Sequence, residues 1–187
     1  MVALETPLCD FDRKAIDFCL PGVDGKTWTL AECSGPRGVL VMFLCNHCPY
    51  VQMVVDRLIC DVKELQTSYG IGAVAIMAND VEEYPQDSFD NMKKFATQRG
   101  FCFPYLYDAT QETAQRYEAV CTPDFFGFNA DNKLQYRGRL DGARQQMTSN
   151  ARRELFEAMM MVSKIGRGPQ EQYPSIGCSI KWRNTMT

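Results

Sequence analysis

The chain has 187 residues, of which 45% are hydrophobic and 23% are charged, and its formal net charge is −3 at pH 7. These values are typical of a soluble globular protein, and they give no reason to expect nucleic acid or an anionic membrane as a partner. The length suits one domain, which we expect to span residues 1–187. The N-terminal stretch is acidic without the apolar core of a signal peptide, and no run is long enough for a membrane helix. We therefore expect a cytoplasmic protein whose thiols are kept reduced.

The first elements that the sequence predicts form an N-terminal hairpin over about residues 15–31. Residues 17–21 and 27–30 have the pattern of two short strands, and the Asp24-Gly25 pair between them is typical of a hairpin turn.

Residues 39–65 hold the stretch on which the function depends. Residues 39–44 are continuously apolar, which predicts a strand buried on both faces. Apolar residues then recur at helical spacing from Val51 to Leu65, which predicts an amphipathic helix. Cys45 and Cys48 stand between the two, at the expected first turn of the helix. Because a helix N-terminus carries partial positive charge and free N–H groups, it stabilises a thiolate, so a Cys-x-x-Cys pair there is typical of redox chemistry.

Three other interpretations of the cysteine pair compete with this one. Nine cysteines in 187 residues can produce this spacing by chance. A structural disulfide would close a very small loop and constrain little. A zinc site commonly has four ligands, whereas the chain has no second ligand pair and a single histidine, His47. We therefore favour redox chemistry and expect no bound metal and no cofactor. The remaining scattered cysteines are expected to be small hydrophobic core residues: Cys9, Cys19, Cys33, Cys60 and Cys102.

The middle of the chain predicts a second buried strand over residues 71–77, parallel to the first, so that strand, helix and strand form a βαβ unit. Asp80 follows at the carboxyl edge of this strand, where ligands bind in open α/β sheets, and it is a candidate for the site. A turn or cap is an equal alternative for Asp80. Three elements follow: a helix starting at Asp87-Ser88 and ending at Gly100, a strand over 103–107 and a helix over 112–120.

The last third of the chain begins with Cys121-Thr122-Pro123, which leads into an aromatic strand over residues 124–128. A turn connects it to an alternating strand over 134–138, typical of an antiparallel edge. Ser149 or Asn150 is expected to cap a last helix. Residues from about 166 to 187 are expected to form an irregular tail, which carries Cys178.

The order of these elements resembles the thioredoxin fold in its peroxiredoxin-like form. The chain as a whole resembles the alkyl hydroperoxide reductase/thiol-specific antioxidant type of thioredoxin-like protein, through the motifs CNHCPYV, CTPDFFGF, YRGRLD and PSIGCSIKW. This resemblance implies a three-layer α/β/α fold around a mixed central sheet, with an N-terminal β-hairpin extension and an inserted helix and strand.

The resemblance also implies roles for the residues of the motifs. Cys45 would be the exposed nucleophile, and Cys48 would be the buried resolving cysteine. Thr122 and Pro123 match the threonine and cis-proline that face such a pair and hold an extended substrate through backbone hydrogen bonds. The residues alone would equally suit a plain turn at Thr122-Pro123.

Two departures from the family pattern bear on the mechanism. Peroxiredoxins carry Thr-x-x-Cys before the peroxide-reducing thiol, and here Met42 stands three residues before Cys45, which makes direct peroxidase activity doubtful. Thioredoxins bury an aspartate six residues before the first cysteine, a position held here by Val39, and Val51 replaces the glutamate of some relatives. The proton acceptor is left unassigned among three candidates: His47, Asp80 and Asp124.

We therefore predict a thiol–disulfide oxidoreductase that exchanges protein or small-molecule disulfides through Cys45 and Cys48, with an external thiol as reductant. A charged His47 would stabilise the Cys45 thiolate and Asn46 would add a polar contact, so the pKa of Cys45 is expected below about 7. The alternatives are a thiol-dependent peroxidase and a redox-silent binding or metal-carrying module. Cys121 and Cys178 are candidates for additional redox residues, or for inert core residues.

Overall fold

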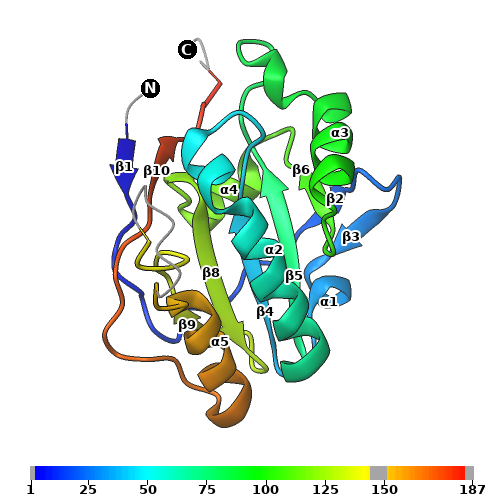
Figure 1. Cartoon of the computed structure of the whole chain (residues 1–187). Helices are drawn as coiled ribbons and strands as arrows, with labels where there is room; N and C mark the ends of the chain where they lie inside the picture. The colour runs from blue at the N-terminus through cyan, green and yellow to red at the C-terminus, as the bar shows by residue number, and fades with distance from the viewer. Residues whose placement is uncertain (1–2, 144–150, 184–187) are drawn as a thin grey trace.

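A computed structural model describes residues 3–143 and 151–183 of the chain. Its centre is a mixed sheet in which β8 pairs antiparallel with both β4 and β9, while β5 pairs parallel with β6. The Leu44 N–H just after β4 donates to Ile76 O of β5 at 3.0 Å, which joins the two halves side by side (Figure 1). The strand bounds are β4 (Gly38–Phe43), β5 (Ile71–Met77), β6 (Tyr105–Tyr107), β8 (Asp124–Asn129) and β9 (Leu134–Tyr136).

Helices cover both faces of this sheet, so the predicted three-layer arrangement and thioredoxin-like fold are confirmed (Figure 1). The reason is visible along β4, where even-numbered residues from Leu40 pack on one face and odd-numbered residues from Val39 on the other. One face is covered by α2 (Pro49–Tyr69), α3 (Phe89–Arg99) and α5 (Glu154–Ile165), and the other by α1 (Leu30–Cys33) and α4 (Glu112–Tyr117).

The helix α2 has the bounds that its pattern predicts. Pro49 occupies its first position, where the missing N–H costs nothing, and Gly70 ends it in the left-handed conformation. Its buried stripe, which includes Val51 and Leu58, packs against the sheet. Cys48 is therefore the N-cap residue of this helix.

The N-terminal hairpin and the inserted elements are also present. β2 (Cys19–Pro21) and β3 (Thr27–Thr29) pair antiparallel, and the Val23 N–H beyond β2 donates to Tyr105 O at 2.9 Å. The insertion consists of η1, a short 3₁₀ helix (Pro85–Asp87), followed by α3 and β6. No helix within residues 3–143 and 151–183 is both long and apolar enough to cross a membrane.

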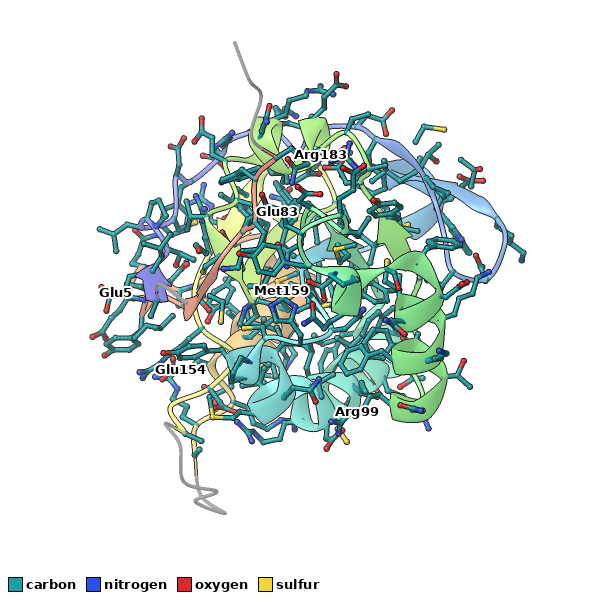
Figure 2. All side chains as sticks on the ribbon, turned by 90° about the horizontal axis from the view of Figure 1, so that it is seen from above. Glu5, Glu83, Arg99, Glu154, Met159 and Arg183 are labelled. Carbon is teal, nitrogen blue, oxygen red and sulfur yellow. The ribbon has the colours of Figure 1, made fainter. Side chains whose placement is uncertain are left out.

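The tail contains a strand, which the sequence analysis did not predict. β10 (Ile176–Ser179) lies between β1 (Ala3–Glu5) and β7 (Cys121–Thr122) and pairs antiparallel with both. A four-residue strand is too short to show a clear period, and its partners lie far away along the chain. β1 with Glu5 lies on the opposite side of the molecule from α3 (Figure 2), and the tail at Arg183 lies 3.7 Å from Asp80.

The start of α5 also differs from the prediction. Its N-cap is Arg153, whereas the expected caps Ser149 and Asn150 lie outside the described residues. Arg153 is held there by contacts with α2, because its guanidinium donates to Asp61 and Glu64 at 2.8 Å each.

The core role expected for the scattered cysteines is wrong for three of them. Cys33 is buried and Cys9 is partly buried, but Cys19, Cys60 and Cys102 are exposed. Cys19 lies in the N-terminal hairpin, and Cys60 lies on the solvent side of α2. The hydrophobic character of a cysteine side chain is therefore not enough to predict that it is buried.

Candidate active site

The sheet and α2 bring Cys45 and Cys48 into the protein interior. Cys45 lies two residues after the end of β4, and Cys48 caps α2. Cys45 is only 1% exposed and Cys48 is fully buried, so the prediction of an exposed Cys45 is wrong. Two elements that are distant in sequence lie against Cys45: β7 through Thr122 and η1 through Asp87.

Thr122 contacts both sulfurs. Its hydroxyl lies 3.2 Å from Cys45 Sγ, and its carbonyl oxygen accepts a hydrogen bond from the Cys48 thiol at 3.0 Å. The Thr122-Pro123 peptide bond is cis, as the resemblance implies, and Pro123 is buried beside the pair. The resemblance also implies that an extended substrate binds to the backbone at Thr122. In the structure β10 already occupies this edge, because it pairs with Thr122.

Asp87 is the residue at the site that the sequence analysis did not identify. Its side chain is fully buried, Oδ1 accepts the Asn46 N–H at 2.8 Å, and Oδ2 accepts Asn79 Nδ2 at 2.8 Å. His47 Nδ1 lies 2.7 Å from the same Oδ2. The sequence assigned Asp87 to the start of a helix, and no local pattern points to partners about forty residues away. Asp87 therefore holds the loop between the two cysteines in place.

Asn46 fixes the same loop from the other side. Its Oδ1 accepts the hydroxyl of the buried Tyr105 at 3.0 Å, its Nδ2 donates to Gln86 O at 3.1 Å, and its carbonyl oxygen accepts from Gln52 Nε2. Asn46 is 8% exposed, so it is a bracing residue of the site and not only a surface polar contact.

His47 is packed and is not a free surface side chain. Its ring stacks on Tyr84, with centroids 5.8 Å apart and planes 8° apart. The hydrogen bond to Asp87 raises the pKa of His47 above its ordinary value of 6.5, and the charge of Asp87 adds to this against the effect of burial. The imidazole therefore favours its charged form more than a solvated histidine does.

The acidity of the two thiols differs from the expectation. The hydrogen bond with Cys48, burial and the charge of Asp87 together raise the pKa of Cys45 well above its usual value. The Cys45 bond, together with bonds from Cys178 and the Val51 N–H, holds the pKa of Cys48 well below its usual range, against burial. The predicted acidic Cys45 is therefore wrong in this reduced structure. Cys48 is the residue at the helix terminus, whereas Cys45 faces a buried carboxylate.

Asp80 serves a turn. Its carboxylate accepts the Glu82 N–H at 3.0 Å and lies 3.7 Å from Arg183, and its own N–H donates to Lys181 O at 2.8 Å. Asp80 thus anchors the tail, and its hydrogen bonds lead away from the sulfurs.

Asp124 and Cys121 also have partners of their own. Asp124 is fully buried, pairs with Arg137 at 2.9 Å and accepts the Val120 N–H at 3.2 Å. The Cys121 thiol points to Pro123 O at 3.5 Å, and burial strongly raises the pKa of Cys121. Asp124 and Cys121 thus support the segment on either side of Thr122 and Pro123.

The comparison with protein families agrees with this arrangement of a thiol pair on a mixed sheet. The model of the AhpC/TSA family matches residues 11–137, which is more than half of the chain. The chain belongs to the AhpC/TSA family. Membership of this thioredoxin-like, peroxiredoxin-like redox family supports a thiol-based redox function.

Solved structures extend the likeness of this AhpC/TSA protein to its full length. An uncharacterized conserved protein from Geobacillus kaustophilus is 42% identical, with a TM-score of 0.92 and coverage of 99% of this chain and 98% of that one. A hypothetical protein from Sinorhizobium meliloti 1021 is 33% identical, with a TM-score of 0.86 and coverage of 97% and 98%. A putative thiol:disulfide interchange protein DsbE from Chlorobium tepidum shares the fold at 20% identity, with a TM-score of 0.61 and coverage of 83% and 98%. No curated protein matches the chain.

Three side chains at the site of this AhpC/TSA protein lie close enough together to bind one metal ion. Ligand atoms of Cys45, His47 and Asp87 all lie within 4.8 Å of one another. The Asp87 oxygens already accept hydrogen bonds from Asn46 and Asn79, and His47 Nδ1 bonds to the carboxylate. A metal would have to displace these bonds, so the absence of a resident metal remains our prediction.

We predict that the single histidine of this AhpC/TSA protein titrates above pH 6.5 in the folded state, and in its ordinary range in the Asp87→Asn variant. A pKa raised by folding contributes stability below the unfolded value, and this is lost as the pH rises through the folded pKa. The proton NMR spectrum shows one imidazole, so the assignment is unambiguous. Denaturant unfolding against pH should show the same loss in the wild type and not in His47→Gln. A midpoint at or below 6.5 would contradict the His47–Asp87 contact.

Proposed function

We propose that the protein is a thiol–disulfide oxidoreductase in which Cys45 and Cys48 form the redox pair. The observation that carries this proposal is the contact of both sulfurs with Thr122, at 3.2 Å to its hydroxyl and 3.0 Å to its carbonyl oxygen, at the N-terminus of α2. Its substrates are protein or small-molecule disulfides, an external thiol returns the pair to the reduced state, and the protein acts in the cytoplasm.

The distribution of charge suggests how the first step proceeds. Because the pKa of Cys48 is lowered and that of Cys45 is raised, Cys48 ionises first; it then gives up its own hydrogen bond to Thr122 O and accepts one from the Cys45 thiol. As Cys45 Sγ attacks a substrate disulfide, its proton passes to Cys48 Sγ, the substrate S–S bond breaks, and one substrate thiolate leaves. Cys48 thus accepts the proton of Cys45 in this step, which is a different transfer from the one for which the sequence leaves His47, Asp80 and Asp124 as candidates, the removal of the proton from Cys48.

The second step closes the Cys45–Cys48 disulfide. Cys48 Sγ attacks Cys45 Sγ in the mixed disulfide, its proton passes to the departing substrate sulfur, and the second substrate thiol is released. One proton and one negative charge are present on the sulfurs before and after, so the two steps balance. Asp87 and Asn46 keep the loop between the cysteines fixed while the sulfur bonds change.

A thiol-dependent peroxidase is the second candidate. Met42 occupies the usual threonine position, but the Thr122 hydroxyl lies 3.2 Å from Cys45 Sγ and offers a hydroxyl from another part of the chain. A coupled assay separates the two functions, because a peroxidase consumes hydroperoxide at a rate that depends on Cys45. We expect disulfide reduction to be the faster activity.

The proposed function is tested in the Cys178→Ser variant, in which Cys178 cannot compete with Cys45 for Cys48. We expect a reversible Cys45–Cys48 disulfide in a dithiothreitol redox buffer, identified by alkylation and mass spectrometry. Reduction of oxidised glutathione or insulin should fall by on the order of 10²-fold or more in Cys45→Ser and Cys48→Ser, since the intramolecular partner is lost. Cys60→Ser, at an exposed position on α2, is the matched control. A Cys178→Ser protein that never forms the disulfide contradicts the proposal.

A further inference from the structure

The edge of the sheet beside the cysteine pair is occupied by the protein's own strand β10. In its antiparallel register, Cys178 stands opposite Thr122 and Ser179 opposite Cys121. The Ser175 hydroxyl donates to Pro123 O at 2.8 Å, which fixes the strand at its start. β10 is therefore built into the site.

Gly177 shows how close this approach is. A Cβ atom at this position would lie 2.2 Å from Thr122 O, which is backbone and cannot rotate away. A glycine before Cys178 is therefore required for β10 to pack directly on the Thr122 carbonyl, the group that also accepts the Cys48 thiol.

Three sulfurs meet at this point. Cys48 makes hydrogen bonds with both Cys45 and Cys178. Cys45, Cys48 and Cys178 belong to one buried cluster, with exposed fractions of 1%, 0% and 3%. Exchange between these neighbouring sulfurs needs no further access from solvent once the first disulfide has formed.

We propose that Cys178 is a third redox residue, which attacks Cys48 Sγ of the Cys45–Cys48 disulfide to form Cys48–Cys178 and release Cys45. This proposal rests on the proposed function. The Cys48–Cys178 bond forms, the Cys45–Cys48 bond breaks, and the Cys178 thiol proton passes to Cys45 Sγ. The number of disulfides is unchanged, so the step needs no added oxidant or reductant.

The electrostatics confine this attack to the oxidised protein. Burial, followed by the bond to Cys48 and the charge of Cys48, raises the pKa of Cys178 to about 12 in the reduced protein. When Cys48 is part of a disulfide, it carries no negative charge, and Lys181 still favours the thiolate against burial. Cys178 thus becomes more acidic when the pair is oxidised.

The consequence for the reaction is that Cys45 becomes available again. After the exchange, the disulfide lies between α2 and β10, and Cys45 carries a thiol that can attack a second disulfide substrate. The protein would then hold one disulfide, which is two oxidising equivalents, while its nucleophile remains reduced.

The test uses the Cys45→Ser variant, which keeps only Cys48 and Cys178 of the three sulfurs. The protein is incubated with oxidised glutathione, quenched in acid, alkylated, digested and analysed by mass spectrometry. We expect a Cys48–Cys178 cross-linked peptide as the main intramolecular product. The matched control Cys45→Ser/Cys121→Ser should keep this product, and Cys45→Ser/Cys178→Ser should give only glutathione on Cys48.

Three outcomes would overturn the proposal. The first is a folded Cys45→Ser protein with glutathione on Cys48 and no link to Cys178, and the second is a link from Cys48 to Cys121. If Cys45→Ser does not fold, as judged by circular dichroism, the wild type decides. The oxidised wild type must then contain a species with Cys45 alkylated and Cys48 linked to Cys178. The absence of that species is the third outcome that would overturn the proposal. A Cys178→Ser protein that still forms Cys45–Cys48 shows that only the third residue has failed, and the proposed function stands.

Discussion

The Arg137→Met variant should lose about 3–5 kcal/mol of unfolding free energy, because it leaves a buried carboxylate without its partner. Arg137 is 4% exposed, Asp124 is fully buried, and their closest atoms are 2.9 Å apart. The guanidinium also donates to Glu118 O at 2.8 Å and lies 4.4 Å from the centroid of the Phe126 ring. Burial already raises the pKa of Asp124 even with Arg137 present, so removing Arg137 leaves the cost of burial uncompensated.

Denaturant unfolding of the variant against a matched control measures this effect. Arg13 pairs with Glu118 at 2.8 Å at the surface, so Arg13→Met should cost less than about 1 kcal/mol. The double variant Asp124→Leu/Arg137→Met should recover part of the stability, since neither charge remains buried. Equal losses in Arg137→Met and Arg13→Met would mean that the buried pair is not formed.

The Asp87→Asn variant should lower the pKa of Cys45 and destabilise the protein by about 1–3 kcal/mol. The carboxylate raises the pKa of Cys45 through its charge, and it satisfies Asn46, His47 and Asn79 in the interior. An asparagine keeps the volume, but its NH₂ group cannot accept from the Asn79 amide. The protein therefore loses buried hydrogen bonds while Cys45 loses a neighbouring negative charge.

The alkylation rate of Cys45 against pH measures the first effect, in a Cys48→Ser background with and without Asp87→Asn. The matched control is Asp80→Asn, because Asp80 serves a turn and its hydrogen bonds lead away from the sulfurs. An alkylation profile that Asp87→Asn leaves unchanged would contradict the electrostatic role of Asp87. Thermal unfolding of the same proteins gives the change in stability.

The core of the fold could be predicted because its elements carry strong local patterns. Burial decides these elements, and it leaves a visible pattern in the sequence. The two buried strands appear as continuous apolar runs at residues 39–44 and 71–77, and the helix appears as helical spacing up to Leu65. Gly70 and Gly100 end α2 and α3 in the left-handed conformation, as their positions after the periodic residues predict.

The site could be predicted only where a motif or a resemblance marked it. Cys45, Cys48 and Thr122 come together as the resemblance implies. Asp87 could not be identified, because its partners lie across the fold and an aspartate before a helix is usually explained by capping. The acidity of the thiols was assigned to the wrong sulfur for the same reason, since it depends on Asp87 and on which cysteine is the N-cap.

The tail was the least predictable part, because β10 derives its structure from strands at distant positions in the chain. Its four residues have no usable period, and each backbone partner belongs to β1 or β7. Only the glycine before Cys178 hinted at a close backbone approach, and glycine is too common in tails for that to decide the structure.

The pairing of Ala3 with Cys178 also has a consequence for how the protein folds. This contact closes a loop around almost every other element, so its entropy cost is high and it should form late. Until then, β10 is paired beside Thr122 with β7 alone and lacks its outer partner β1. Pulse alkylation during refolding should therefore find Cys178 protected later than Cys45 and Cys48, because its position opposite Ala3 is completed only when the two distant segments meet.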